Sequence, residues 1–211
     1  MKIIKPSYEI LTEIDGIKEL QHIEKIGRVC YKSEEKITED GESAKKFVGM
    51  LIRNGHEAMI EHSSLSVKFV VDRGVSHEIV RHRIASFAQE STRYCNYSKD
   101  KFGSEITVIE PSFFDKDSAQ YGEWEIACRD AEKHYFNLIN LGNATPQEAR
   151  SVLPNSLKTE ITMTANYREW RNYFKLRTDS HAHPQIKEVS IPLLRELQEQ
   201  IPVIFDDIEV N

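Results

Sequence analysis

The strongest constraint on the fold is a long helical stripe in the second half of the chain. Apolar side chains recur there at alternating spacings of three and four residues, and they end before Gly142. The stripe consists of Tyr121, Trp124, Cys128, Ala131, Tyr135 and Leu138. This spacing places the side chains on one face of an α-helix, so the segment predicts a helix that packs against a core.

Other segments predict a mixture of helices and a few strands. Residues 44–52 have helical spacing and stop at Asn54-Gly55, whereas residues 65–71 alternate like a strand and end at a turn over residues 72–74. Ser76 is expected to cap a helix that runs through Ile84, with a loop at residues 89–94. Two further helices are predicted at residues 162–175 and after Pro184. The pattern favours an α+β fold in which several helices pack on a small, mainly antiparallel sheet.

Length and charge limit the class of protein. The chain has 211 residues, 39% of them hydrophobic, which fits one compact domain over residues 1–211. Its net charge of −6 argues against binding of nucleic acid or anionic membranes through bulk electrostatics. An anionic ligand must therefore be held by a local cluster of cationic side chains.

Cysteine use and hydropathy predict a soluble, cytoplasmic protein. Cys30, Cys95 and Cys128 are widely spaced and form no CxxC pair, as expected in a reducing compartment. We find no apolar run long enough for a signal peptide or a membrane span.

The segment RHRIASFAQESTRY, residues 81–94, has an unusual density of polar side chains. If it starts on a helix, Arg81 and Arg83 point about 200° apart, so two anionic ligands, or one long ligand bent around the helix end, fit better than one clamped phosphate. Arginine forks bind phosphate bidentately, and Ser91, Thr92 and loop amides can complete a phosphate cradle. The alternative is a solvated face where these arginines pair with Glu78 and Glu90.

The order RHR, seven residues, Ser91 and then Arg93 resembles the signature of the flavin-dependent thymidylate synthases. Several other blocks resemble the same family in the same order. They are GRVCY at 27–31, GHEAMIEH at 55–62, EARSVLPNSL at 148–157, NYREW at 166–170 and LRTDSHAHPQI at 176–186.

The resemblance implies two groups of ligand-binding residues. The residues implied for FAD are Arg81, His82, Arg83, Gln89, Asn166, Arg168, Asn172 and His56. The residues implied for dUMP are Glu78, Arg81, Gln89, Ser91, Thr92, Arg93, Arg150 and Arg177. It also implies a homotetramer with active sites between subunits.

The reaction implied is reductive methylation of dUMP to dTMP, with 5,10-methylenetetrahydrofolate as one-carbon donor, FAD as hydride carrier and NADPH as reductant. Arg177 would be the catalytic residue. A guanidinium beside the uracil N3 and its neighbouring carbonyl stabilises negative charge on the ring and makes C5 more nucleophilic, without a cysteine nucleophile. Three departures from the family pattern are Cys30 for Ser, Ala58 for Thr or Ser, and Glu78 for Gln.

Three alternatives stay open. A metal-dependent hydrolase is disfavoured because the histidines of GHEAMIEH are six apart rather than at the HExxH spacing, so no metal site is predicted. A silent nucleotide-binding module is disfavoured by the intact RHR and Arg177. A related flavoenzyme with a different one-carbon donor cannot be distinguished by sequence.

Overall fold

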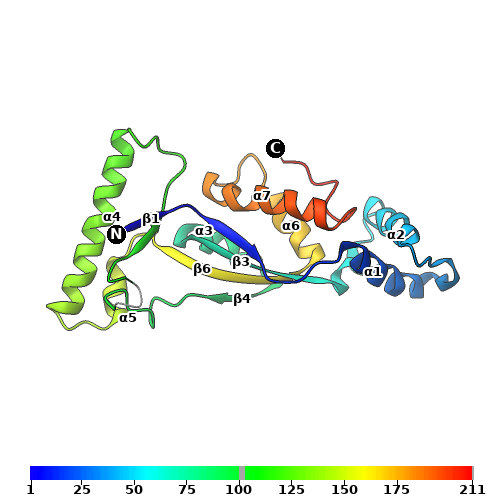
Figure 1. Cartoon of the computed structure of the whole chain (residues 1–211), viewed down its shortest axis with the longest axis horizontal. Helices are drawn as coiled ribbons and strands as arrows, with labels where there is room; N and C mark the ends of the chain where they lie inside the picture. Colours follow the sequence, from blue (N-terminus) through cyan, green and yellow to red (C-terminus); the bar gives the residue numbers. More distant parts are fainter. Residues whose placement is uncertain (100–102, 211) are drawn as a thin grey trace. The chain divides into compact units, whose positions relative to one another are not determined.

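The computed structural model describes residues 1–99 and 103–210. Helices and strands are mixed along the sequence (Figure 1). In the first half they are β1 (Lys2–Ile4), β2 (Ser7–Ile10), α1 (Gly16–Tyr31), η1 (Glu34–Lys36), α2 (Glu42–Arg53), η2 (Glu57–His62), β3 (Ser64–Asp72), α3 (Arg73–Ile79) and β4 (Ala85–Gln89). In the second half they are β5 (Thr107–Ile109), α4 (Ala119–Asn140), α5 (Pro146–Ala149), η4 (Arg150–Val152), β6 (Lys158–Asn166), α6 (Tyr167–Arg177) and α7 (Pro184–Gln200).

The strands form a four-stranded sheet in the order β2-β3-β6-β4 and a two-stranded sheet of β1 and β5. The β1–β5 pair is parallel, with Ile3 opposite Val108. Every second residue of β3 and β6 is buried, so each strand turns one face to a core. The predicted α+β class, with several helices and a small, mainly antiparallel sheet, is confirmed.

The internal contacts of the chain define two compact units. The first unit contains residues 1–7, 69–81 and 87–162, and the second contains residues 8–68, 82–86 and 163 onward. The segments of the two units interleave along the sequence, and β3, β4 and β6 contribute residues to both. One domain over residues 1–211 stays a prediction.

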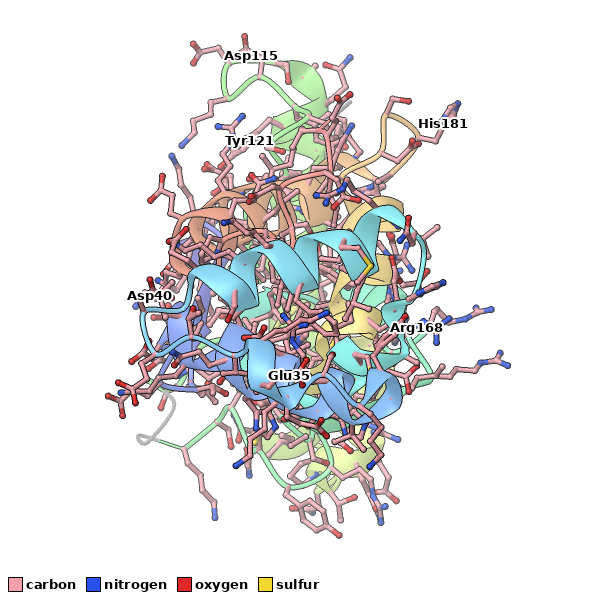
Figure 2. The ribbon with its side chains drawn as sticks, turned by 90° about the vertical axis from the view of Figure 1, so that its right-hand side faces the viewer. Glu35, Asp40, Asp115, Tyr121, Arg168 and His181 are labelled. Carbon is pink, nitrogen blue, oxygen red and sulfur yellow. The ribbon has the colours of Figure 1, made fainter. Side chains whose placement is uncertain are left out.

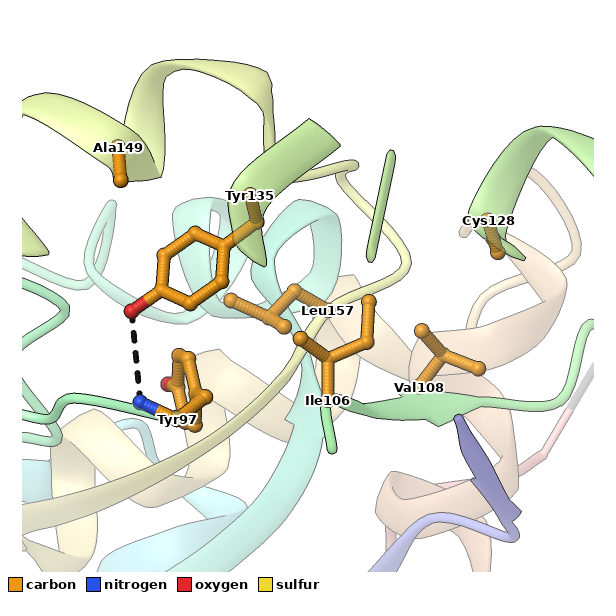
Figure 3. Close-up of a cluster of buried hydrophobic side chains, with 7 residues drawn as sticks. All are labelled: Tyr97, Ile106, Val108, Cys128, Tyr135, Ala149 and Leu157. Carbon is orange, nitrogen blue, oxygen red and sulfur yellow. Dashed lines mark hydrogen bonds between the residues drawn. The ribbon is translucent and has the colours of Figure 1, made fainter. Parts of the chain in front are cut away.

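The core of the first unit gathers around α4. Cys128 and Tyr135 of this helix are buried, and the Tyr135 hydroxyl accepts a hydrogen bond from the Tyr97 amide at 3.3 Å (Figure 3). The cluster in the figure consists of Tyr97, Ile106, Val108, Cys128, Tyr135, Ala149 and Leu157. The predicted helix and its packing role are therefore confirmed, although Leu138 at its end is 36% exposed.

The core of the second unit centres on α6. Trp170 and Phe174 are fully buried, and Phe174 packs edge-on against Phe205 with ring centroids 5.6 Å apart. The Trp170 indole N–H is also satisfied, because it donates to the Leu65 carbonyl at 3.0 Å.

Helices α1 and α2 belong to the same unit and lie side by side in Figure 2. Gly27 of α1 permits their close approach, because a Cβ at this position would lie 2.6 Å from the Phe47 ring of α2.

The element predictions were right where periodicity was long and wrong at three boundaries, namely the start of α3, the end of α3 and the start of α6. The helices at 44–52, 121–138 and after Pro184 and the strand at 65–71 are confirmed. The predicted turn at 72–74 is wrong, because Asp72 caps α3, and its carboxylate accepts from the Val75 amide at 2.6 Å. Ser76 is consequently inside the helix and not at its cap.

The predicted helix through Ile84 is also wrong, because α3 ends at Ile79 and residues 85–89 form β4. The helix expected at 162–175 begins only at Tyr167. Residues 158–166 alternate buried and half-buried side chains as strand β6, so tertiary burial selected the strand period over the helical one.

Replacement of the α3 cap tests this assignment. We expect Asp72→Ala to lower the free energy of unfolding by about 1–2 kcal/mol, because Asp72 is buried and the Val75 amide loses its acceptor. Asp72→Asn keeps an acceptor and should lose less than half as much. Urea unfolding of the three proteins measures the difference, and equal stability of Asp72→Ala and wild type would contradict the capping role.

Candidate functional site

The residues implied as ligands divide between the two units. Arg81, Gln89 and most of the dUMP set (Glu78, Ser91, Thr92, Arg93 and Arg150) belong to the first unit. The second unit contains Arg177 and most of the FAD set, namely His56, His82, Arg83, Asn166, Arg168 and Asn172.

A cleft in the second unit brings together residues that are distant in the sequence. It has a volume of about 490 Å³. Its lining residues are Glu57, Glu61, Ile84, Asn166, Arg168, Glu169, Asn172 and Lys175. Asn166, Arg168 and Asn172 of the predicted FAD set therefore share one cleft.

The junction of β6 and α6 positions these three side chains. Asn166 ends the strand and caps the helix, and its side-chain oxygen accepts from the Glu169 amide at 2.9 Å. Arg168 and Asn172 lie four residues apart on α6, so they follow one side of the helix. Arg168 and Asn172 both line the cleft.

The cleft contains charges of both signs. Arg168 is 53% exposed at the edge of the unit, where Figure 2 labels it, and its Nη1 lies 2.5 Å from Glu61 Oε1. A second carboxylate, that of Glu57, lies 3.9 Å from Arg168 Nε. An anionic ligand that binds the Arg168 guanidinium in this cleft would have to displace Glu61 from it.

Arg171 fixes the position of Glu57 and was missed by sequence reasoning. It is 2% exposed and its Nε donates to Glu57 Oε1 at 3.1 Å. The same guanidinium binds Asp207 through two hydrogen bonds of 2.6 and 2.8 Å and also donates to the Ile204 carbonyl. These bonds hold the pKa of Asp207 below its usual value. The sequence alone did not separate the buried Arg171 from the exposed Arg168, because both are arginines of the same charged helix.

His82 connects the cleft to Arg177. The ring is buried, its Nδ1 lies 2.8 Å from Glu169 Oε1, and Arg177 Nε donates to its Nε2 at 3.1 Å. Because Arg Nε–H can only donate, Nε2 must accept, and the ring is neutral with its hydrogen on Nδ1. Both ring nitrogens are thus engaged within the chain, so a flavin contact by His82 would have to use its backbone or ring face.

The charge state of His82 follows from its surroundings. Burial lowers the pKa of His82 below its ordinary value of 6.5, and the Arg177 charge acts in the same direction. The hydrogen bond to Glu169 opposes this shift, and the Tyr173 ring packs beside the imidazole with centroids 5.0 Å apart.

Two other residues of the predicted FAD set lie apart from these contacts. His56 is exposed, and its Nδ1 is 3.5 Å from the Tyr31 hydroxyl. Arg83 is exposed beside Ile84, which lines the cleft. Their roles as ligands stay predictions.

In the first unit, four residues of the predicted dUMP set lie on β4 and the loop after it, namely Gln89, Ser91, Thr92 and Arg93, whereas Glu78 lies on α3 and Arg150 on η4. Gln89 ends the strand and donates to Ser76 Oγ at 2.9 Å and to Thr159 Oγ1 at 3.3 Å. In the loop, Ser91 Oγ accepts from the Arg93 amide at 3.3 Å. Arg150 Nη1 donates to Thr92 Oγ1 at 3.3 Å, which links the EARSVLP block to this loop. Ser91, Thr92, Arg93 and Arg150 are thereby brought together.

Glu90 anchors the same loop. The sequence suggested it only as an ion-pair partner of the arginines and did not reveal this anchoring role. Its carboxylate accepts from the Tyr97 hydroxyl and from Lys158 Nζ, each at 2.9 Å. Its carbonyl accepts from Arg73 Nη1 at 3.3 Å. Lys158 lies 68 residues from Glu90 along the chain, so no local pattern could reveal the pair.

The helical argument for Arg81 and Arg83 is wrong in its geometry. Arg81 follows the end of α3, and its amide donates to the Glu78 carbonyl at 3.2 Å, but residues 81–84 are not helical. The two side chains are both exposed, and they belong to different units. Their division between two ligands therefore does not follow from a 100° helical step.

Two features are absent from residues 1–99 and 103–210. In that part of the chain, no group of three or more His, Cys, Asp or Glu side chains could hold a metal ion. None of its helices is both long and apolar enough to cross a membrane.

A comparison with family models decides the family. The model described as Thy1, thymidylate synthase complementing protein, matches residues 14–203. The chain belongs to this family. The Thy1 match spans both units, and the resemblance noted from the sequence is confirmed.

Individual relatives agree with the Thy1 assignment. The flavin-dependent thymidylate synthase of Corynebacterium glutamicum is 31% identical over 216 residues, which cover 95% of this chain and 83% of that protein. The enzyme of the same name from Mycobacterium marinum is 31% identical over 222 residues, covering 98% and 85%. Among solved structures, the UMP/dUMP methylase PolB from Streptomyces cacaoi, bound with 5-Br dUMP, has a TM-score of 0.80 at 22% identity. The match covers 98% of this chain and 96% of PolB, and it supports the Thy1 fold.

The buried neutral His82 predicts a contribution to acid sensitivity. Because its folded pKa is lowered, the unfolded chain binds more protons as the pH falls through 6.5 toward the folded pKa. The stability due to His82 is therefore complete above pH 6.5 and is lost below it. We expect the unfolding free energy of His82→Asn to depend less on pH between 8 and 5 than that of wild type, measured by urea unfolding.

The exposed His134 on α4 offers a matched control. His134→Asn should keep the pH dependence of the wild type. An unchanged slope in His82→Asn would show that His82 is not buried as the neutral ring.

Proposed function

We propose that this Thy1 protein is a flavin-dependent thymidylate synthase. It would convert dUMP to dTMP with 5,10-methylenetetrahydrofolate as one-carbon donor, FAD as hydride carrier and NADPH as reductant. The observation that carries the proposal is the convergence of Asn166, Arg168 and Asn172 on one cleft, with His82 linking this cleft to Arg177. Relatives that bear this enzyme name support it.

The side chains of the cleft fit a flavin dinucleotide. Arg168 and Lys175 offer positive charge to a diphosphate, and the amides of Asn166 and Asn172 offer donors and acceptors to polar ring or ribose atoms. Glu61 holds Arg168 close to the cleft and would give up this guanidinium to the ligand. When bound, the reduced flavin takes part in one-carbon transfer and supplies the hydride that completes the methyl group.

The first unit provides residues suited to the dUMP phosphate. Arg93 and Arg150 supply two guanidinium groups, and Ser91 and Thr92 supply hydroxyls on the same loop. Glu90 and Lys158 hold the loop in place before a ligand arrives, which lowers the cost of ordering it on binding.

Arg177 would act on the uracil ring by electrostatics. Its Nε–H is used by His82, and the fork of its two Nη groups is suited to a planar N3–carbonyl edge. Positive charge at this edge stabilises negative charge on the ring and raises the nucleophilicity of C5. The proposed reaction needs no cysteine nucleophile, and Cys128 is buried in the core of the first unit.

The proposal includes a cytoplasmic homotetramer in which residues of more than one chain contribute to each active site. A homologous flavoenzyme that methylates the same nucleotide from a different donor is the main alternative. A silent nucleotide-binding module is the other, and a flavin redox cycle separates it from both enzymes.

A spectroscopic assay tests the function. The purified protein, supplied with FAD if needed, should show a flavin spectrum that bleaches with NADPH under anaerobic conditions. It should reoxidise and form dTMP only when dUMP and methylenetetrahydrofolate are both present. A control with UMP in place of dUMP tests whether the enzyme requires a deoxyribose in its substrate. dTMP formation without the folate would favour the alternative donor, and no flavin binding would favour the silent module.

Two arginine variants test the division of roles. We expect Arg177→Ala to keep its bound flavin and to lose dUMP-dependent turnover by about 10²–10³-fold, the size of losing one preorganised charge-stabilising donor. Arg83→Ala should chiefly weaken flavin binding, measured by titration of the apoprotein with FAD. Equal flavin loss in both variants would contradict these separate roles.

A further inference from the structure

A series of hydrogen bonds connects the Glu169 side chain to Arg177 through His82. Glu169 Oε1 accepts from Asn172 Nδ2 at 3.2 Å and lies 2.8 Å from His82 Nδ1, and His82 Nε2 accepts from Arg177 Nε at 3.1 Å. Glu169 is 7% exposed and His82 is 3% exposed. All four residues belong to the second unit.

Both hydrogen bonds of His82 can form only if its ring hydrogen is on Nδ1 and not on Nε2. A carboxylate can only accept, so Glu169 requires the hydrogen on Nδ1. Nε2 then has a lone pair directed at Arg177 Nε–H, which fixes the plane of the guanidinium. The other tautomer would place Nε2–H against Nε–H, two donors facing each other, and Arg177 would lose this hydrogen bond.

We propose that Glu169 is a positioning residue for Arg177 and acts through the tautomer of His82. This inference rests on the proposed function of Arg177 as the group that activates the uracil ring. It gives Glu169 a role besides lining the cleft, because one carboxylate oxygen contacts both Asn172 of the predicted FAD set and the histidine that orients Arg177.

If Glu169 served only to cap α6, loss of its carboxylate would lower the stability of the helix but would not affect Arg177 in the folded protein. The sequence spacing of Asn166 and Glu169 is that of an N-cap and the third helical residue, where a glutamate often caps the helix. The capping here uses the Glu169 amide, whereas its carboxylate turns to His82 and Asn172. Loss of the carboxylate should therefore affect Arg177 even in a fully folded protein.

Three variants separate these roles. In Glu169→Gln the side-chain amide has a donor as well as an acceptor, so it no longer restricts the His82 hydrogen to Nδ1, whereas Glu169→Asp keeps a carboxylate that can only accept. Glu24→Gln is the matched control, because Glu24 is a fully buried carboxylate in the same unit that binds Arg28 and Ser43 and has no part in the proposed site.

The kinetic readout is kcat for dTMP formation per bound flavin, with KM for dUMP. We expect Glu169→Gln to lower kcat by roughly 10- to 100-fold, the range for loss of an outer partner that orients a functional side chain. Glu169→Asp should recover at least part of the loss, and Glu24→Gln should lose stability but keep the wild-type kcat. A Glu169→Gln enzyme with wild-type kcat and KM would overturn the proposal.

A second readout is independent of activity. The ¹⁵N shifts of the His82 ring, assigned by comparison with His82→Asn, should report hydrogen on Nδ1 in wild type and Glu169→Asp, and a shift toward Nε2–H in Glu169→Gln. Hydrogen on Nε2 in the wild type would overturn the tautomer mechanism in any enzyme class. A wild type without dUMP-dependent turnover would instead refute the proposed function, so the two failures are distinguishable.

Discussion

The second unit depends on the junction where β6 becomes α6. The alternating residues of the strand reach Asn166, whose side chain caps the helix, and the next eleven residues form α6. Because the strand fixes where the helix begins, it also fixes the direction of every side chain on the helix. Trp170 and Phe174 face the core, whereas Arg168 and Asn172 face the cleft.

The charged residues of α6 illustrate how burial separates chemically similar groups. Arg168 is exposed and paired with Glu61, so a ligand can displace its partner at small cost. Arg171 is buried and binds Glu57, Asp207 and the Ile204 carbonyl, so it holds the wall of the cleft and the C-terminal segment. Removing Arg171 would take the shared cation away from Glu57 and Asp207. The cost would fall mainly on Glu57, whose side chain is 19% exposed, because Asp207 is 50% exposed.

The two ligand groups are supported by different means. In the first unit, Glu90 and Arg73 hold the loop of Ser91 and Arg93 through long-range bonds to Lys158 and Thr159. In the second, the series from Glu169 to Arg177 orders a guanidinium through a neutral imidazole. In the proposed enzyme, both arrangements would hold cationic groups in position before an anionic partner binds, which is the condition for strong electrostatic stabilisation.

The sequence alone determined the family, the α+β class, and the helices with long periodic stripes, because those patterns are local and repeat over several turns. Through the family blocks it also predicted ligand roles for Asn166, Arg168, Asn172 and Arg177, and these roles stay predictions. Only the tertiary structure decided that residues 158–166 are a strand, that Ile84 lies outside α3, and that Glu169 and Arg171 are buried. The physical reason is that burial and hydrogen-bond partners come from segments tens of residues away, as His82 and Glu169 are 87 apart, so local spacing contains no record of them.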